Sequence, residues 1–137
     1  AQKVEVFVPV HKFEDFKIKA VASPVIIKNM QELVHEVYVD KRIKDYILGI
    51  VSKTRAKDFP EGIYVSLGAS PRASIALFIA AKAEALIHGR SYVIPSDVKK
   101  VAGDVLRHRI LLSFRARAES VNTDKVIQAI LKLVDVP

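Results

Sequence analysis

One segment limits the possible folds of this chain more than any other. It runs from Leu67 to Arg90 and reads LGASPRASIALFIAAKAEALIHGR, with few polar side chains after Ser70-Pro71-Arg72. A helix that is apolar on nearly every side must be covered by neighbours on several sides. Gly89 is a suitable residue to end such a helix. The segment therefore predicts a mainly α protein, a helical bundle with the Arg72 helix at its centre.

The composition is that of one globular domain. The chain has 137 residues, of which 50% are hydrophobic and 27% are charged, and this balance is typical of a folded protein. It has no cysteine, which excludes disulfides and cysteine-based zinc sites. No apolar run approaches the roughly 20 residues that cross a membrane, and there is no secretory segment. We therefore expect a cytoplasmic protein without a membrane partner.

Five helices are expected in total. Their predicted starts are Ser23-Pro24, Asp40, Ser70-Pro71, Pro95, and Asn122 or Thr123, where capping residues or helix-starting prolines stand. Apolar residues at helical spacing define the faces that we expect to be buried: Ile26, Met30, Leu33 and Val37; Ile43, Tyr46, Ile47, Ile50, Val51 and Thr54; Val98, Val101, Ala102, Val105 and Leu106; and Val126, Ile127, Ile130, Leu131 and Val134.

Two further segments have an extended pattern. Val4, Val6, Val8 and Val10 alternate with other residues, so we expect residues 1–22 to form a short strand or extended arm, with Pro9 favouring an edge position. The stretch KDFPEGIYVSLGA is predicted to be a loop with one short strand at Ile63–Val65.

Arg72 is an unusual residue for the first turn of a buried helix. A cation there is unfavourable by about 0.3–1 kcal/mol, because the helix start already carries partial positive charge. The same two features favour binding of a phosphate or another anion, and the net charge of +7 also suits an anionic partner. Alternatively, Arg72 extends into solvent or pairs with a nearby carboxylate such as Glu61.

A resemblance gives this arginine a role. Residues Leu67–Ser113 carry Gly-Ala-Ser-Pro-Arg, then Gly-Arg-x-Tyr-Val and Pro-x-Asp-Val, and this combination resembles the C-terminal helical lid of MoxR-type AAA+ ATPases. Residues Val37–Arg55 are similar to the preceding helix of that lid. The resemblance covers roughly residues 23–113. It implies a lid domain at residues 23–137, with residues 1–22 as a linker from an ATPase core.

The resemblance also implies a mechanism. Arg72 would be the sensor-2 arginine, which contacts in cis the γ-phosphate of ATP on the protein's own P-loop domain. Gly68 would give the backbone freedom, Ser70 would cap the helix and Pro71 would set its first turn. Proteins of this family use ATP and Mg²⁺, form rings that are commonly hexamers, and remodel or mature partner complexes in a chaperone-like way. Some are named as methanol dehydrogenase regulators.

The chain also departs from the family. Members usually carry threonine where this chain has Ile94, which cannot cap a helix, although Asp97 in the first turn can offset part of the loss. More importantly, there is no GxxxxGK[ST] phosphate loop and no acidic Mg²⁺-binding segment after a strand. We therefore expect this chain to hold neither ATP nor Mg²⁺ and to be inactive by itself.

A basic tract follows the fourth helix and contains Arg107, His108, Arg109, Arg115 and Arg117. It can be a solvated face at a helix end, where cations suit the helix dipole. By the resemblance, Arg107, His108 and Arg109 can instead contact an adjoining subunit or the ATPase domain. Binding of nucleic acid is less favoured, because aromatic residues for stacking are sparse around the tract.

Other candidate sites are weak. The four histidines (His11, His35, His88 and His108) are far apart in the sequence, so a metal site is not expected. No arrangement suggests a hydrolytic site. Tyr46 is expected in the core, and by the resemblance it is a weak candidate for the nucleotide pocket. A rival interpretation remains: a free-standing, basic, all-α module that binds DNA or an acidic protein.

Overall fold

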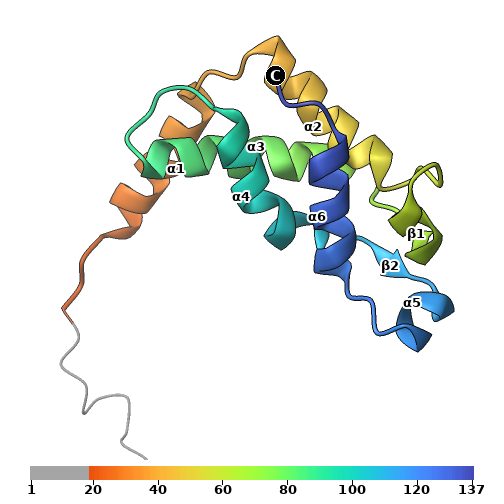
Figure 1. The fold of residues 1–137 in the computed structure, drawn as a ribbon. Coiled ribbons are helices and arrows are strands. Elements are labelled where there is room, and N and C mark those ends of the chain that lie inside the picture. Colours follow the sequence, from red (N-terminus) through yellow and green to blue (C-terminus); the bar gives the residue numbers. More distant parts are fainter. Residues whose placement is uncertain (1–18) are drawn as a thin grey trace, which may run out of the picture.

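The computed structural model describes residues 19–137. This part of the chain forms six α-helices: α1 (Pro24–Glu36), α2 (Lys41–Lys53), α3 (Arg72–Ile87), α4 (Pro95–Leu106), α5 (Phe114–Ala118) and α6 (Thr123–Leu133) (Figure 1). The mainly α fold is confirmed, with one helix more than expected. The predicted strand at Val4–Val10 and the residue His11 lie outside the described residues.

The α3 helix is central, as predicted. It packs against α1, α2 and, most extensively, α4, and in Figure 1 it crosses the middle of the molecule. Its buried face consists of Ala73, Leu77, Ala81, Lys82 and Ala85. Three of these are alanines, whose small side chains allow the neighbouring helices to approach closely. The helix ends where Gly89 takes a φ of 68°, a conformation that glycine adopts without strain.

The core lies between α2, α3, α4 and α6. The predicted stripe of α2 is fully buried, and the stripes of α4 and α6 are buried or half-buried. The largest fully buried side chains include Ile50, Leu77, Leu106, Ile127 and Ile130. Asp40 and Asn122 cap α2 and α6 through side-chain oxygens that accept from backbone N–H groups. These helices therefore start where the capping residues predicted.

The α1 helix differs from its prediction. Ser23 caps it and Pro24 is its first residue, as expected. However, Ile26, Met30 and Leu33 are exposed by 46%, 51% and 52%, and no residue within α1 is buried. The expected buried stripe was wrong for this helix, because α1 packs mainly on α3 and only Val37, just after its end, enters the core.

The segment between α2 and α3 also differs. Pro60–Tyr64 is a 3₁₀-helix, labelled η2, and the strand β1 is Val65–Leu67 rather than Ile63–Val65. It pairs antiparallel with β2 (Leu111–Leu112). The Ser113 N–H donates to Tyr64 O at 2.7 Å, and Ser113 Oγ caps α5 by accepting from Ala116 N. The extra helix α5 therefore follows directly from the end of the small sheet.

No helix among residues 19–137 combines the length and the apolar character that crossing a bilayer requires.

Candidate functional site

Arg72 is the first residue of α3, and its side chain is exposed. Within residues 19–137 it forms no ion pair. Pairing with Glu61 does not occur; Glu61 lies on η2, beside Lys125 and other residues of α6. Among residues 19–137, Arg72 is therefore not neutralised by Glu61 or by another carboxylate, and its guanidinium is exposed.

The start of α3 is built differently from the expectation for Ser70. No side chain caps the helix. Instead, the Ala73 N–H donates to the backbone carbonyl of Ser70 at 2.9 Å, and the Ser74 N–H donates to that of Pro71 at 3.0 Å. Pro71 has helical angles, which agrees with its expected role in the first turn. Because two N–H groups are already bonded, the Arg72 side chain is the main group at this end that can bind an anion.

Gly68 is required for close approach rather than for backbone freedom. Its φ is not positive, but a Cβ at this position would lie 2.4 Å from Thr54 O and 2.7 Å from Arg55 Cγ. Beside it, the Ala69 N–H donates to the buried Thr54 Oγ1 at 2.9 Å, and Thr54 Oγ1 donates to Val51 O at 2.7 Å. These contacts fix the loop before Arg72 to the end of α2, so they set the position of the arginine.

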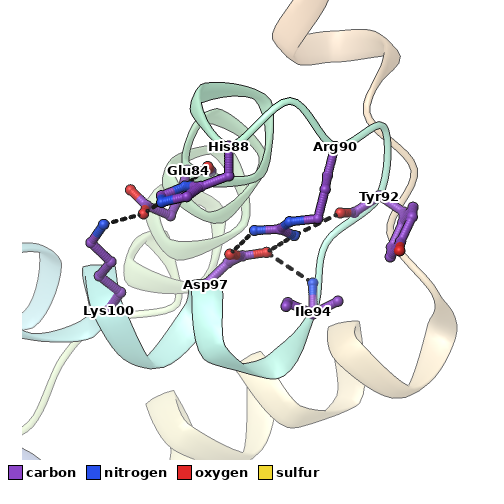
Figure 2. A network of polar contacts seen from close by, with 7 residues as sticks. All are labelled: Glu84, His88, Arg90, Tyr92, Ile94, Asp97 and Lys100. Atoms are coloured by element: carbon purple, nitrogen blue, oxygen red, sulfur yellow. Dashed lines mark hydrogen bonds and ion pairs between the residues drawn. The ribbon is translucent and has the colours of Figure 1, made fainter.

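A second arginine lies just beyond the other end of α3 (Figure 2). Arg90 Nη1 and Nη2 donate to the two oxygens of Asp97 at 2.7 and 2.5 Å, and Arg90 Nη1 also donates to Tyr92 O. Asp97 is 4% exposed. Burial alone would raise the pKa of Asp97, but the hydrogen bonds from Arg90 and Ile94 N and the charge of Arg90 outweigh it, and the pKa is lowered. The pair joins the end of α3 to the start of α4.

Asp97 also compensates for the missing capping group at Ile94. The Ile94 N–H donates to Asp97 Oδ2 at 2.9 Å, so the carboxylate bonds the backbone at the helix start although Ile94 has no capping group. The helix still begins at Pro95, as predicted. The Gly-Arg-x-Tyr-Val and Pro-x-Asp-Val segments therefore form a structural clamp, and sequence spacing alone did not identify this ion pair.

The same region holds a second cluster. Glu84 Oε1 lies 2.5 Å from Lys100 Nζ and 3.2 Å from His88 Nδ1 (Figure 2). In addition, the Tyr38 N–H donates to Ser91 O at 2.8 Å, and the Val93 N–H donates to Tyr38 O at 3.0 Å. The loop between α3 and α4 is thus held from both helices and from the segment before α2.

Lys82 is a buried cation that no sequence pattern indicated. It is 8% exposed, and its Nζ donates to His35 O at 2.7 Å and lies 5.3 Å from the centre of the Phe78 ring. The acceptor is at the C-terminal end of α1, where the helix dipole favours a positive charge. Lys82 therefore fastens α1 to α3 and is not available as an anion ligand.

Tyr46 is a core residue with one unsatisfied group. It is 3% exposed, and its hydroxyl has no hydrogen-bond partner within the described residues. Burial raises the pKa of this hydroxyl. The expected core position is confirmed, whereas its weak candidacy for the nucleotide pocket stays a prediction.

Most of the basic tract is paired within the chain. Arg107 bonds to Asp124 at 2.9 Å and to Asp104 at 3.3 Å. Arg109 donates to Val105 O and contacts His108, and Arg115 bonds to Glu119 at 2.7 Å. These pairs favour the interpretation as a solvated surface. The contact of Arg107, His108 and Arg109 with another subunit or domain stays a prediction.

Residues 19–137 contain no group of three or more histidines or carboxylates that could hold a metal ion. The most buried carboxylate, Asp97, is already bonded to Arg90 and Ile94. The start of α3 carries the exposed guanidinium of Arg72, a group that can bind an anion.

Comparisons with known proteins agree with this arrangement. The family described as AAA lid domain matches residues 61–130, about half of the chain. The chain is 37% identical over 126 residues to "Chaperone MoxR1" of Mycobacterium tuberculosis, covering 87% of this chain and 33% of that protein. It is 43% identical over 119 residues to YeaC of Bacillus subtilis, covering 84% and 36%, and 28% identical over 114 residues to "Protein MoxR" of Methylorubrum extorquens, covering 75% and 33%.

A solved structure of a candidate ATPase from Cytophaga hutchinsonii is also similar. It superposes with a TM-score of 0.70 at 37% identity, covering 77% of this chain and 33% of that one. The chain thus spans about a third of the length of these relatives. The family match, the relatives and the shared fold agree: this chain belongs to the AAA lid domain family and is a lid of the MoxR type.

Proposed function

We propose that this chain is the lid of an AAA+ ATPase and closes over ATP that is bound by a P-loop domain. Arg72 is the sensor-2 residue and contacts the γ-phosphate. The observation that carries the proposal is the state of this arginine: it is exposed and free of ion pairs within the described residues, at the start of the central helix of the fold. A guanidinium fork binds phosphate oxygens with two parallel hydrogen bonds, so phosphate is a suitable ligand.

The surrounding contacts explain how Arg72 would transmit the nucleotide state. Thr54 ties the loop before α3 to α2, and the clamp between Arg90 and Asp97 ties the other end of α3 to α4. A displacement of Arg72 therefore moves a packed unit rather than one side chain. When the γ-phosphate is lost, Arg72 loses its charged partner, and the lid is released from the closed position.

The P-loop domain would supply the remaining parts. ATP and Mg²⁺ would be held there, because residues 19–137 offer no set of metal ligands and the sequence has no phosphate loop. In the complete protein, ATP hydrolysis would drive remodelling or maturation of partner proteins, by a ring that is commonly a hexamer in this family. We place the protein in the cytoplasm as part of the same proposal. Methanol dehydrogenase is one candidate class of client.

The test uses the complete protein, with its P-loop domain, and the variant Arg72→Ala. We expect ATP turnover to fall by about tenfold or more, or nucleotide-dependent assembly to be lost, because removal of one group that stabilises transition-state charge costs this much or more. The matched control is Lys132→Ala, which removes an exposed cation on α6. Turnover and assembly like those of the wild type in the Arg72→Ala variant would refute the sensor assignment.

The alternative of a free-standing basic module has less support. Three arginines of the basic tract are bonded to acceptors within the chain, so fewer cations remain for phosphate contacts on DNA. It predicts that the 137-residue chain binds duplex DNA with an affinity that falls steeply as salt rises. Absence of binding at low salt would remove this alternative.

A further inference from the structure

We propose that the lid docks on the P-loop domain through a surface formed by α2 and α3, and that Arg55 is a second cation at the phosphate end of this surface. We call it the α2/α3 surface and define it by Lys44 and Leu48 of α2, Arg55 just after α2, and Arg72, Ile75, Phe78 and Ile79 of α3. This inference rests on the proposed function and names the residues that bring the two domains together.

Helical spacing places these residues on two adjacent faces. Lys44 and Leu48 are four residues apart on α2, and Arg72, Ile75 and Ile79 are separated by three and four residues on α3, so each set lies along one side of its helix. Arg55 follows directly after the C-cap of α2, Thr54. Between the helices, Lys44, Ile47 and Leu48 face Ser74, Ile75 and Phe78 across a groove of about 310 Å³. Ile75 lines this groove and also shares a helix face with Arg72, so it joins the apolar groove to the arginine.

The middle of the strip is apolar and uncovered. Leu48 is 53% exposed, Ile75 62% and Ile79 46%. Large apolar side chains that gather on one face beside a charged residue mark an interaction surface. Covering them would also favour closure of the lid, because removing apolar surface from water is favourable.

Arg55 lies at the same end as Arg72. A Cβ on Gly68 would lie 2.7 Å from Arg55 Cγ, so the stem of Arg55 rests against the loop that leads to Arg72. The bond between Ala69 N and Thr54 Oγ1 fixes this arrangement. Arg55 is exposed and, among residues 19–137, has no ion pair. Within the described part of the chain, two guanidinium groups without an ion pair therefore lie at one end of the apolar strip.

The two arginines at one end of an apolar surface indicate which kind of partner can bind. The partner must present concentrated negative charge at the arginine end and an apolar surface beyond it. A P-loop domain with a bound triphosphate supplies the negative charge, and the proposal requires an apolar patch on that domain beside the nucleotide. A second copy of the same surface would bring its own arginines to this end, and like charges repel. DNA offers the charge but no apolar surface that would cover Leu48 and Ile75.

The same reasoning excludes a second apolar groove as the docking site for the P-loop domain. It lies between α1 and the C-terminal half of α3 and is lined by Ile27, Met30, Gln31, Leu33, Val34, Ala83, Leu86 and Ile87. None of these residues is charged, and the groove is at the opposite end of α3 from Arg72. It lacks the cations that identify a partner carrying nucleotide.

Cysteine labelling in the complete protein tests the docking. The 137 residues have no cysteine, so Ile75→Cys gives a unique label in this domain once cysteines elsewhere in the protein are replaced. With a non-hydrolysable ATP analogue, we expect maleimide to label Ile75→Cys at least about fivefold more slowly than without nucleotide, because docking removes the side chain from solvent. The control is Leu133→Cys on α6, where the native residue is 49% exposed; its labelling rate should not change. Unchanged labelling of Ile75→Cys would overturn the docking surface.

Kinetics test Arg55. We expect Arg55→Ala to raise the KM for ATP by about fivefold, since loss of one charged hydrogen bond costs roughly 1 kcal/mol or more, and Arg55→Lys to recover part of the loss. Lys132→Ala is again the control. A KM like that of the wild type in Arg55→Ala would overturn its role.

The outcomes separate this inference from the proposed function. If Arg72→Ala slows ATP turnover but Ile75→Cys is labelled at the same rate with and without nucleotide, the sensor assignment stands and the docking surface is wrong. If Arg72→Ala turns over ATP normally, the proposed function fails whatever the labelling shows.

Discussion

The two ends of α3 each carry an arginine, and the two arginines are in opposite states. Arg90 is bonded to both oxygens of the buried Asp97 and to a backbone carbonyl. Arg72 is exposed and has no ion pair within residues 19–137. Both belong to motifs that resemble the same family, yet only one of them is available to a ligand.

The comparison shows how to separate structural from functional residues in a recurring motif. An arginine that is fully bonded within its own chain holds elements in place, and its removal leaves a buried carboxylate without a partner. An arginine without a partner in an otherwise well-bonded domain contributes little to the fold. It is therefore the better candidate for a functional residue.

The largest effect on stability is expected from Arg90→Ala. It leaves the Asp97 carboxylate buried and unpaired, and breaking a buried ion pair costs about 3–5 kcal/mol; because Arg90 is 23% exposed, we expect about 2–4 kcal/mol. Urea denaturation of the 137-residue chain measures this loss of unfolding free energy. The matched variant Arg72→Ala should stay within about 0.5 kcal/mol of the wild type. Equal losses in the two variants would contradict the distinction between the two ends.

A smaller effect is expected at the Arg72 end from Thr54→Val. This variant keeps the side-chain shape but removes the acceptor for Ala69 N and the donor to Val51 O. Leaving these buried groups unbonded should cost about 1–3 kcal/mol. The control is Ser52→Ala, an exposed position on the same helix. A stability equal to that of the control would mean that Thr54 does not fix the loop before Arg72.

The smallest effect is a change in pH dependence at the Arg90 end. The folded-state pKa of Asp97 is lowered, so its contribution is complete above the unfolded-state pKa of about 3.9 and is lost as pH falls through the lower folded-state value. We expect the unfolding free energy of the wild type to decrease below about pH 4 more steeply than that of Asp97→Asn. Urea titrations at a series of pH values compare the two slopes, and parallel curves would show that Asp97 is not the responsible group.

Much of the fold was predictable because local signals agreed with one another. In α2, an aspartate cap is followed by a regular apolar stripe, and every residue of that stripe is buried. Gly89 ended α3 as expected, since a positive φ is a local requirement. Where capping, spacing and termination depend only on neighbouring residues, the sequence is sufficient to predict the element.

The remaining features depend on residues far apart in the sequence. The Met30 stripe has the same periodicity as a buried face, but periodicity does not tell whether another element covers it. Gly68 is needed because Thr54 approaches it, which no local pattern reveals. The short helix α5 is anchored by a bond from Ser113 N to Tyr64 O and by one from Ser113 Oγ to Ile63 O, which joins residues 50 apart in numbering. Tertiary contacts decide all three.

The candidate site also has parts that the local sequence predicts and parts that depend on the folded structure. Arg72 is a candidate because of its motif and its unusual place at a helix start, and its role stays a prediction. Ser70 was assigned the wrong form of capping, because the choice between side chain and carbonyl depends on backbone geometry that composition does not fix. The α2/α3 surface could not be predicted, since its halves come from separate helices and become neighbours only after folding.

The sparse packing of α1 affects how the domain fluctuates. Helix α1 contains no buried residue and packs mainly on α3, with the Lys82 bond to His35 O as one of its few polar ties. Local opening of an element with so few buried contacts requires much less free energy than global unfolding. Its amide protons should exchange with solvent while those of α3 and α4 remain protected. The helix can therefore open and close locally while the core between α2, α3, α4 and α6 stays folded.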